Sequence, residues 1–267
     1  MNTLKKLLND IYAEVREHKS SFIVYIVLRT LVVITFVFQL LNHNYESAFL
    51  CILTLVLLIM PSLVQVTFKV EFPTLLEIII LIFVFAAEIL GEIQEFYMIF
   101  PFWDTILHTI NGFLCAAIGL SLVDLFNRSD KLMFKLSPFF TVITAFCFSM
   151  TIGVLWEFGE FGIDRLFACD TQKDTVIHNI SSVLLDPQNK NIPVHINNIT
   201  EVIVQGQSLN IGGYLDIGLI DTMSDLFVNF IGALVFSVFG YFYIKKQNKK
   251  SIVSRFIPRP KNKTDSQ

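Results

Sequence analysis

The sequence predicts an all-α protein, a polytopic membrane helix bundle with about six transmembrane helices and one long extracytoplasmic loop. Three observations favour this fold class. Hydrophobic residues make up 54% of the chain and charged residues only 16%, and the mean hydropathy is +0.62. Six apolar runs are also long enough to cross a bilayer, which takes about 20 residues at a rise of ~1.5 Å each. Such a composition is typical of integral membrane proteins.

The six apolar runs define an expected membrane domain, residues 21–245. They lie at residues 21–41, 47–66, 75–93, 103–126, 139–161 and 217–243. Residues 1–20 have apolar side chains on one helical face and charges on the other, which predicts a cytoplasmic amphipathic helix, with a plain cytoplasmic cap on the first span as the alternative. Residues 246–267 are polar and basic, and a disordered cytoplasmic tail is expected there.

Lysine and arginine set the expected orientation. Basic residues precede the first span, follow the last, and occur in the second and fourth connections, whereas the first and third connections have none. By the positive-inside rule both termini are cytoplasmic and the long loop, residues 165–216, is extracytoplasmic. Within this loop, residues 194–196 and 201–204 alternate weakly and could form a small hairpin, and residues 175–215 could form a lid or be disordered.

Composition also excludes some partners and sites. The net charge is −3 and no basic stripe with interleaved aromatics occurs, so no nucleic acid is expected, and the predicted partner is the lipid bilayer. Cys51, Cys115 and Cys147 fall in predicted spans, which leaves only Cys169 outside. Neither a disulfide framework nor a thiolate zinc site is therefore indicated.

The third and fourth spans carry polar stripes. Near the end of the third span, Glu88, Glu92 and Glu95 follow at i, i+4 and i+7, which places them on one face of an α-helix. The fourth span begins with three polar residues at the same spacing, namely Asp104, His108 and Asn111. A single buried histidine is more often a satisfied core residue than a ligand, but three other acidic stripes at the same depth make the two interpretations about equal.

The fifth and sixth spans repeat this pattern. Near the end of the fifth, Glu157, Glu160 and Asp164 share a face at i, i+3 and i+7. The sixth begins with Asp221, Asp225 and Asn229 at i, i+4 and i+8. An acidic side chain within a span costs about 2.5 to 3.5 kcal/mol on insertion scales and usually faces a bundle interior or a wet cavity, so the stripes indicate a functional site.

All four stripes fall in the extracytoplasmic half of the bundle, which predicts one acidic pocket open to that side. The alternative is that these groups cap helix ends or lie in the head-group layer. Carboxylates this close cannot all stay ionised unless a cation compensates them. Oxygen ligands with one imidazole suit Mg, Mn or Ca, and two carboxylates with one histidine could also hold catalytic Zn. The predicted ligands are Asp104, His108, Asp164, Asp221 and Asp225, with Glu88, Glu92, Asn111 and Asn229 as further pocket residues.

Three functions from different classes fit such a pocket. The first is an envelope accessory or resistance-type binding protein. The second is a metal-assisted membrane enzyme acting on a lipid-linked or envelope substrate, with Glu157 or Glu160 as general base. The third is a cation-coupled transporter, which is disfavoured because the polar stripe does not continue to the cytoplasmic side.

Three runs carry a resemblance to a known family. They are WDTILHTINGF at 103–113, WEFGEFGIDRLFACDTQKDT at 156–175 and GLIDTMSDLFVNFIGAL at 218–234. They resemble the bacterial inner-membrane proteins of the YjdF type, and the last, with the pattern D-x-x-x-N-x-x-G-A, is distantly similar to the final segment of VanZ-like proteins. The resemblance implies a multi-span protein of the bacterial plasma membrane and no particular reaction. The long loop between Asp174 and Asp221 departs from the compact VanZ-like arrangement.

Overall fold

The computed structural model describes residues 2–17, 19–127, 136–246 and 251–260. Most of the chain is helical, 71%, and six helical segments in the described part are long and apolar enough to cross a membrane. The predicted all-α fold class is therefore confirmed. The chain forms two compact units, Met1–Ile152 with Val228–Gln267, and Gly153–Phe227. The basic connection at 128–135 and the basic residues 249 and 250 lie outside the described residues.

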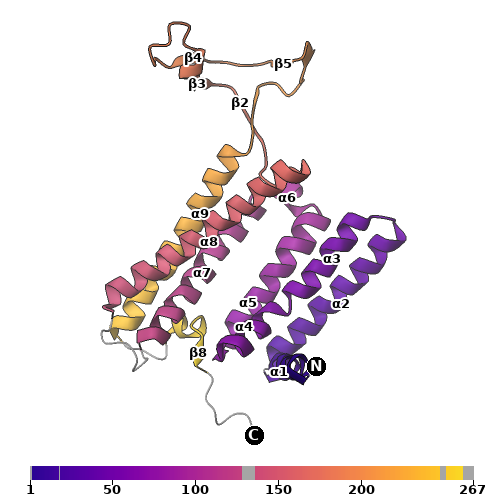
Figure 1. The fold of residues 1–267 in the computed structure, drawn as a ribbon, viewed down its shortest axis with the longest axis vertical. Helices are drawn as coiled ribbons and strands as arrows, with labels where there is room; N and C mark the ends of the chain where they lie inside the picture. The colour runs from indigo at the N-terminus through magenta and orange to yellow at the C-terminus, as the bar shows by residue number, and fades with distance from the viewer. Residues whose placement is uncertain (1, 18, 128–135, 247–250, 261–267) are drawn as a thin grey trace. The chain divides into compact units, whose positions relative to one another are not determined.

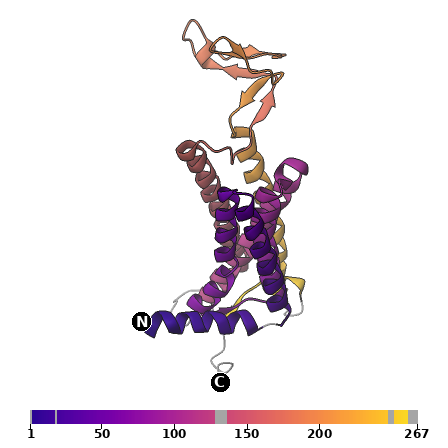
Figure 2. The ribbon, with the colours of Figure 1, turned by 90° about the vertical axis from the view of Figure 1, so that its right-hand side faces the viewer.

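The first unit begins with α1 (Asn2–Glu17), which contacts α2 (Lys19–Leu41) and α4 (Met60–Phe68). Figure 2 shows α1 lying across the ends of the longer helices of this unit. The second span consists of α3 (Tyr45–Leu57) and α4. Asn44 caps α3 by accepting a hydrogen bond from Ser47 N at 3.1 Å. Pro61 lies in the first turn of α4, where its missing N–H is tolerated, so the span is broken between the two helices.

The third span changes its helical type midway. It starts as α5 (Thr74–Phe85) and continues as the wider π-helix η1 (Ala86–Ile93). Glu95 then adopts a left-handed conformation with φ 58°, before the short helix α6 (Phe96–Ile99). At Gly91 a Cβ would overlap the ring of Tyr97, so the glycine lets this ring pack against the helix.

The rest of the first unit is built around α7 (Trp103–Asn127), with parts of α8 (Pro138–Phe167) and α9 (Leu219–Lys246) (Figure 1). The α7 span is 56% buried, whereas that of α2 is only 17% buried, so α7 is the central helix. Small residues let the backbones approach: a Cβ at Gly232 would overlap the carbonyl oxygen of Thr109 and lie 2.9 Å from Phe113 N. The apolar core here includes Ala116, Ala117, Leu120, Ala145, Ala233 and Phe236.

Part of the expected tail is folded. Residues 251–260 contain the short helix η3 (Ile252–Arg255) and the strand β8 (Arg259–Pro260), which pairs antiparallel with β1 (Val70–Glu71). Val253 and Ile257 are buried in the core cluster of α7 and α9. This differs from the disorder expected for 246–267, because a few apolar side chains within a basic segment find partners in the core. Residues 247–250 and 261–267 lie outside the described part.

The second unit contains the long loop between the end of α8 and the start of α9. Its strands are β2 (Thr175–Ile177), β3 (Ile180–Ser182), β4 (Val194–Ile196), β5 (Ile203–Val204), β6 (Gln207–Ser208) and β7 (Tyr214–Asp216), with the short helix η2 (Val183–Leu185) after β3. They pair antiparallel as β2 with β7, β3 with β4, and β5 with β6.

The two segments expected to form a hairpin do become strands, but they do not pair with each other. Residues 194–196 pair with β3, and Ile203–Val204 pairs with β6. Gln205 and Gly206 between β5 and β6 have φ values of 52° and 81°. Positive φ at both positions is typical of a two-residue hairpin turn, and this local turn competes successfully with the more distant pairing.

Candidate functional site

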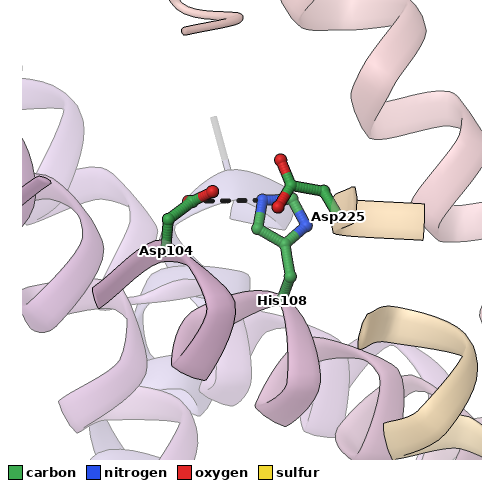
Figure 3. Close-up of side chains that lie close together, drawn as sticks. All are labelled: Asp104, His108 and Asp225. Carbon is green, nitrogen blue, oxygen red and sulfur yellow. Dashed lines mark ion pairs between the residues drawn. The ribbon is translucent and has the colours of Figure 1, made fainter. Parts of the chain in front are cut away.

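An acid–imidazole pair lies in the first two turns of α7. His108 Nε2 is 3.5 Å from Asp104 Oδ1, and the two residues are one turn apart on the helix, as Figure 3 shows. His108 is only 9% exposed. The first turn of a helix also favours a carboxylate, because its free N–H groups carry partial positive charge. The predicted pairing of Asp104 with His108 on one face is therefore present.

One turn further along α7, polar side chains join three helices within the first unit. Asn111 Nδ2 donates to Asn229 Oδ1 at 3.2 Å, and Ser149 Oγ of α8 donates to the Gly112 carbonyl oxygen at 2.8 Å. Asn229 Nδ2 also lies 3.6 Å from Met150 Sδ. Asn229 and Ser149 are fully buried. We call Asn111, Gly112, Ser149 and Asn229 the polar clamp.

Two further predicted site residues lie in the second unit, on the helices that leave the clamp. Asp225 is one turn before Asn229 on α9 and is 4% exposed. Glu157 is eight residues after Ser149 on α8, and it too is 4% exposed. On α8 the buried residues Ala145, Ser149, Gly153 and Glu157 recur every four positions, so Glu157 lies on the buried stripe of its helix.

Asp164 and Asp221, both predicted metal ligands, bind backbone within the second unit. Asp164 accepts hydrogen bonds from Thr171 N at 2.7 Å and from Gln172 N at 2.9 Å. Asp221 Oδ2 accepts one from Lys173 N at 2.8 Å. Both carboxylates thus fix the start of the loop through backbone hydrogen bonds. Their metal-binding role stays a prediction and is not part of the site proposed below.

Glu160 has a partner on its own helix. Its Oε1 accepts a hydrogen bond from Trp156 Nε1 at 2.9 Å, and Trp156 is 54% exposed. This contact places Glu160 beside a side chain at the apolar surface of α8. Of the two general bases predicted from the sequence, Glu157 is therefore the more buried one.

Glu88 and Glu92 lie in η1 rather than in an α-helix. A π-helix closes i to i+5 hydrogen bonds and has more residues per turn, so the expected α-helical stripe through Glu88, Glu92 and Glu95 is not continuous. The left-handed conformation of Glu95 ends it. The 3.6-residue spacing used for the prediction is wrong for this segment, and membership of Glu88 and Glu92 in the pocket stays a prediction.

Sequence reasoning missed two parts of this region. Ser149 was not singled out, although its spacing of eight from Glu157 on one helix could have shown it. Trp103, which begins α7 next to Asp104, was noted only as the start of a span. Its Nε1 is buried and has no hydrogen-bond partner among the described residues.

Fold and site together define the class: a helical membrane protein with six candidate spans among its described residues, and with an acid–imidazole pair, whose imidazole is buried, at the start of α7. More narrowly, the chain belongs to the family described as Predicted membrane protein (DUF2238), which matches residues 24–246. Proteins of the YjdF type are in this family, whereas the likeness to VanZ-like proteins stays a resemblance. No curated protein matches the chain, and neither does any solved structure.

Proposed function

We propose that this protein is a membrane-embedded binding protein for a divalent cation, which is held by Asp104, His108 and Asp225. Its role is that of an envelope accessory protein, and the cation helps to bind a small-molecule or lipid-linked ligand. The observation that carries the proposal is the polar clamp. The helices α7, α8 and α9 meet there, and each carries a buried acidic or imidazole side chain one or two turns from the clamp.

Helix geometry supports the choice of residues. His108 lies one turn before Gly112 on α7, and Asp225 lies one turn before Asn229 on α9, a rise of about 6 Å in each case. Asp104 and Glu157 lie two turns from the clamp, about 12 Å along their helices. α7 and α9 run in the same direction through the clamp, so His108 and Asp225 each come before it, one turn away along its own helix.

The chemistry of these side chains fits a divalent cation. Asp104 and Asp225 each offer a carboxylate oxygen and His108 a ring nitrogen. Two carboxylates and one imidazole leave coordination positions open for water or a ligand, as in catalytic and ligand-binding Zn or Mn sites. Mg and Ca are the weaker candidates, since both prefer oxygen ligands alone. A bound cation would also neutralise carboxylates that are costly within a membrane.

Topology supports a location at the extracytoplasmic side. By the positive-inside rule the basic residues favour cytoplasmic termini, and α7 and α9 would then begin at the outer face. The acid–imidazole pair lies at that end of α7. Together with the family, this favours the bacterial plasma membrane as the site of action.

Metal binding can be tested on the purified full chain. Protein dialysed against EDTA is titrated with MnCl2 or ZnCl2, and binding is followed by calorimetry and by the melting temperature. We expect one tight site in the wild type, lost in H108A. H43A is the matched control, because His43 is an exposed histidine in a connection between spans. Equal titrations of wild type and H108A would overturn the proposal.

A metal-assisted membrane enzyme is the second candidate, favoured by the burial of Glu157. A buried carboxylate near a cation can act as general base toward a metal-bound water. The variant E157Q keeps the shape of the side chain and removes the proton acceptor. If the protein is an enzyme, wild type with Mn converts a component of a membrane lipid extract, as seen by mass spectrometry, and E157Q does not, although it still binds Mn.

A further inference from the structure

We infer that an apolar groove between α5–η1 and α7 holds the hydrocarbon chain of a membrane lipid, with the lipid head group at the Asp104–His108 end. The groove lies entirely within the first unit and has a volume of about 480 Å³. On one side it is lined by Ile79, Ile82 and Ala86, and on the other by Ile106 and Ile110. This volume is typical of a site for one ligand molecule, about 300 to 1,000 Å³.

The shape and surroundings of the groove suit a chain. Along α7 its lining runs from Trp103 to Leu114, a rise of about 16 Å. Phe256 lines it as well and comes from the folded segment after α9. Its other lining residues lie in the candidate spans Thr74–Ile93 and Trp103–Asp124, so in a bilayer hydrocarbon rather than water would surround it.

Trp103, one of the lining residues, carries a polar group. Trp103 Nε1 is buried and has no acceptor among the described residues, although a buried indole N–H usually has one. Trp103 directly precedes Asp104, so the donor lies at the same end of the groove as the acid–imidazole pair. At the other end, Leu114 and Phe256 are apolar.

This distribution of polarity matches a lipid. An apolar solute would leave the indole N–H without an acceptor, whereas an ester or phosphate oxygen of a head group can accept its hydrogen bond. The chain then fills the part of the groove that has no polar groups. The inference depends on the proposed function in one respect: a head group next to Asp104 and His108 would make the lipid the ligand of the cation site.

Three isoleucines allow a matched test. Ile82 and Ile106 line the groove, whereas Ile52 on α3 does not, and each is 49% exposed. I82W and I106W add bulk to the groove, and I52W adds the same bulk elsewhere in a span. The full-length variants are purified in mild detergent, supplied with palmitoyl-oleoyl phosphatidylglycerol, and examined by native mass spectrometry.

We expect a retained lipid in wild type and I52W, and at least about tenfold less in I82W and I106W. W103F keeps the aromatic ring but removes the donor, so its lipid retention should fall about fivefold, the effect of one hydrogen bond. Equal lipid retention in wild type, I82W and I106W would overturn the inference, as would no retained lipid in wild type. If I82W and I106W melt at the same temperature as I52W, misfolding does not explain their loss of lipid. Two groove variants are used so that the test still works if one of them does not fold.

Manganese titration of the same samples separates this inference from the proposed function. We expect I82W to bind Mn as wild type does, because Ile82 lies outside the proposed cation site. If I82W loses its lipid and neither wild type nor variant binds Mn, the groove is correct and the cation site is wrong. If wild type and I82W bind Mn and I82W also retains its lipid, the cation site is correct and the groove is wrong.

Discussion

The substitution Gly232→Ala tests the close contact between α7 and α9. The added Cβ would overlap the Thr109 carbonyl oxygen and lie 2.9 Å from Phe113 N, and both are backbone atoms that cannot rotate away. The helices must therefore move apart, at a typical overpacking cost of about 1 to 3 kcal/mol, less the ~1 kcal/mol that alanine gains over glycine within a helix. A net loss of up to ~2 kcal/mol corresponds to a lower melting temperature by roughly 4 to 8 °C for a chain of this size.

Gly162 of α8 provides the control. A Cβ there meets no atom within 4 Å, so G162A should be neutral or slightly stabilising. Thermal unfolding in detergent compares the variants, and manganese titration of each shows whether the clamp supports the cation site. G232A should melt earlier and bind Mn more weakly. A G232A protein that equals G162A in both measurements would refute the packing of α7 against α9 that we describe.

Further changes test the clamp, the cation site and the loop. N229A leaves the Asn111 amide without its partner, and we expect a loss of about 1 to 3 kcal/mol in unfolding free energy. D104N should weaken Mn binding about 10- to 100-fold, if Asp104 is a ligand or orients His108. In the loop, the N–H of Gln188 at 2.9 Å is the main cause that lowers the pKa of Asp186, helped by Lys190 N at 2.7 Å. A carboxyl whose folded pKa is lowered stabilises above its unfolded pKa, about 3.9, and loses this effect as the pH falls through the folded value. The protection factor of the Lys190 amide against hydrogen exchange should therefore fall in strong acid in wild type, and already at neutral pH in D186N.

The spans could be predicted from sequence because bilayer thickness fixes their length and composition. Their ends were harder to place. The helix of the fifth span, α8, runs to Phe167, six residues beyond the expected end at 161, since acidic residues do not stop a helix. The π-helix η1 was missed because only the periods of α-helix and strand were considered, and the close contact of Gly91 with Tyr97 becomes visible only in three dimensions.

The site was predictable residue by residue but not as an assembly. The spacing of Asp104 and His108 on one helix predicts their pairing, because i and i+4 side chains lie together. That Asn111 meets Asn229 while Asp164 and Asp221 bind backbone depends on contacts between distant parts of the chain. No periodicity within one helix can distinguish these outcomes. The folded residues 251–260 were missed for the same reason, since their partners are β1 and the core of α7 and α9.

Crystals grown with manganese would test the central claim most directly, through an anomalous difference map. The proposed function predicts one strong peak at about 2.0 to 2.3 Å from a ring nitrogen of His108, with carboxylate oxygens of Asp104 and Asp225 at similar distances. A map without a peak beside His108, or with its strongest peak at Asp164 and Asp221, would contradict it.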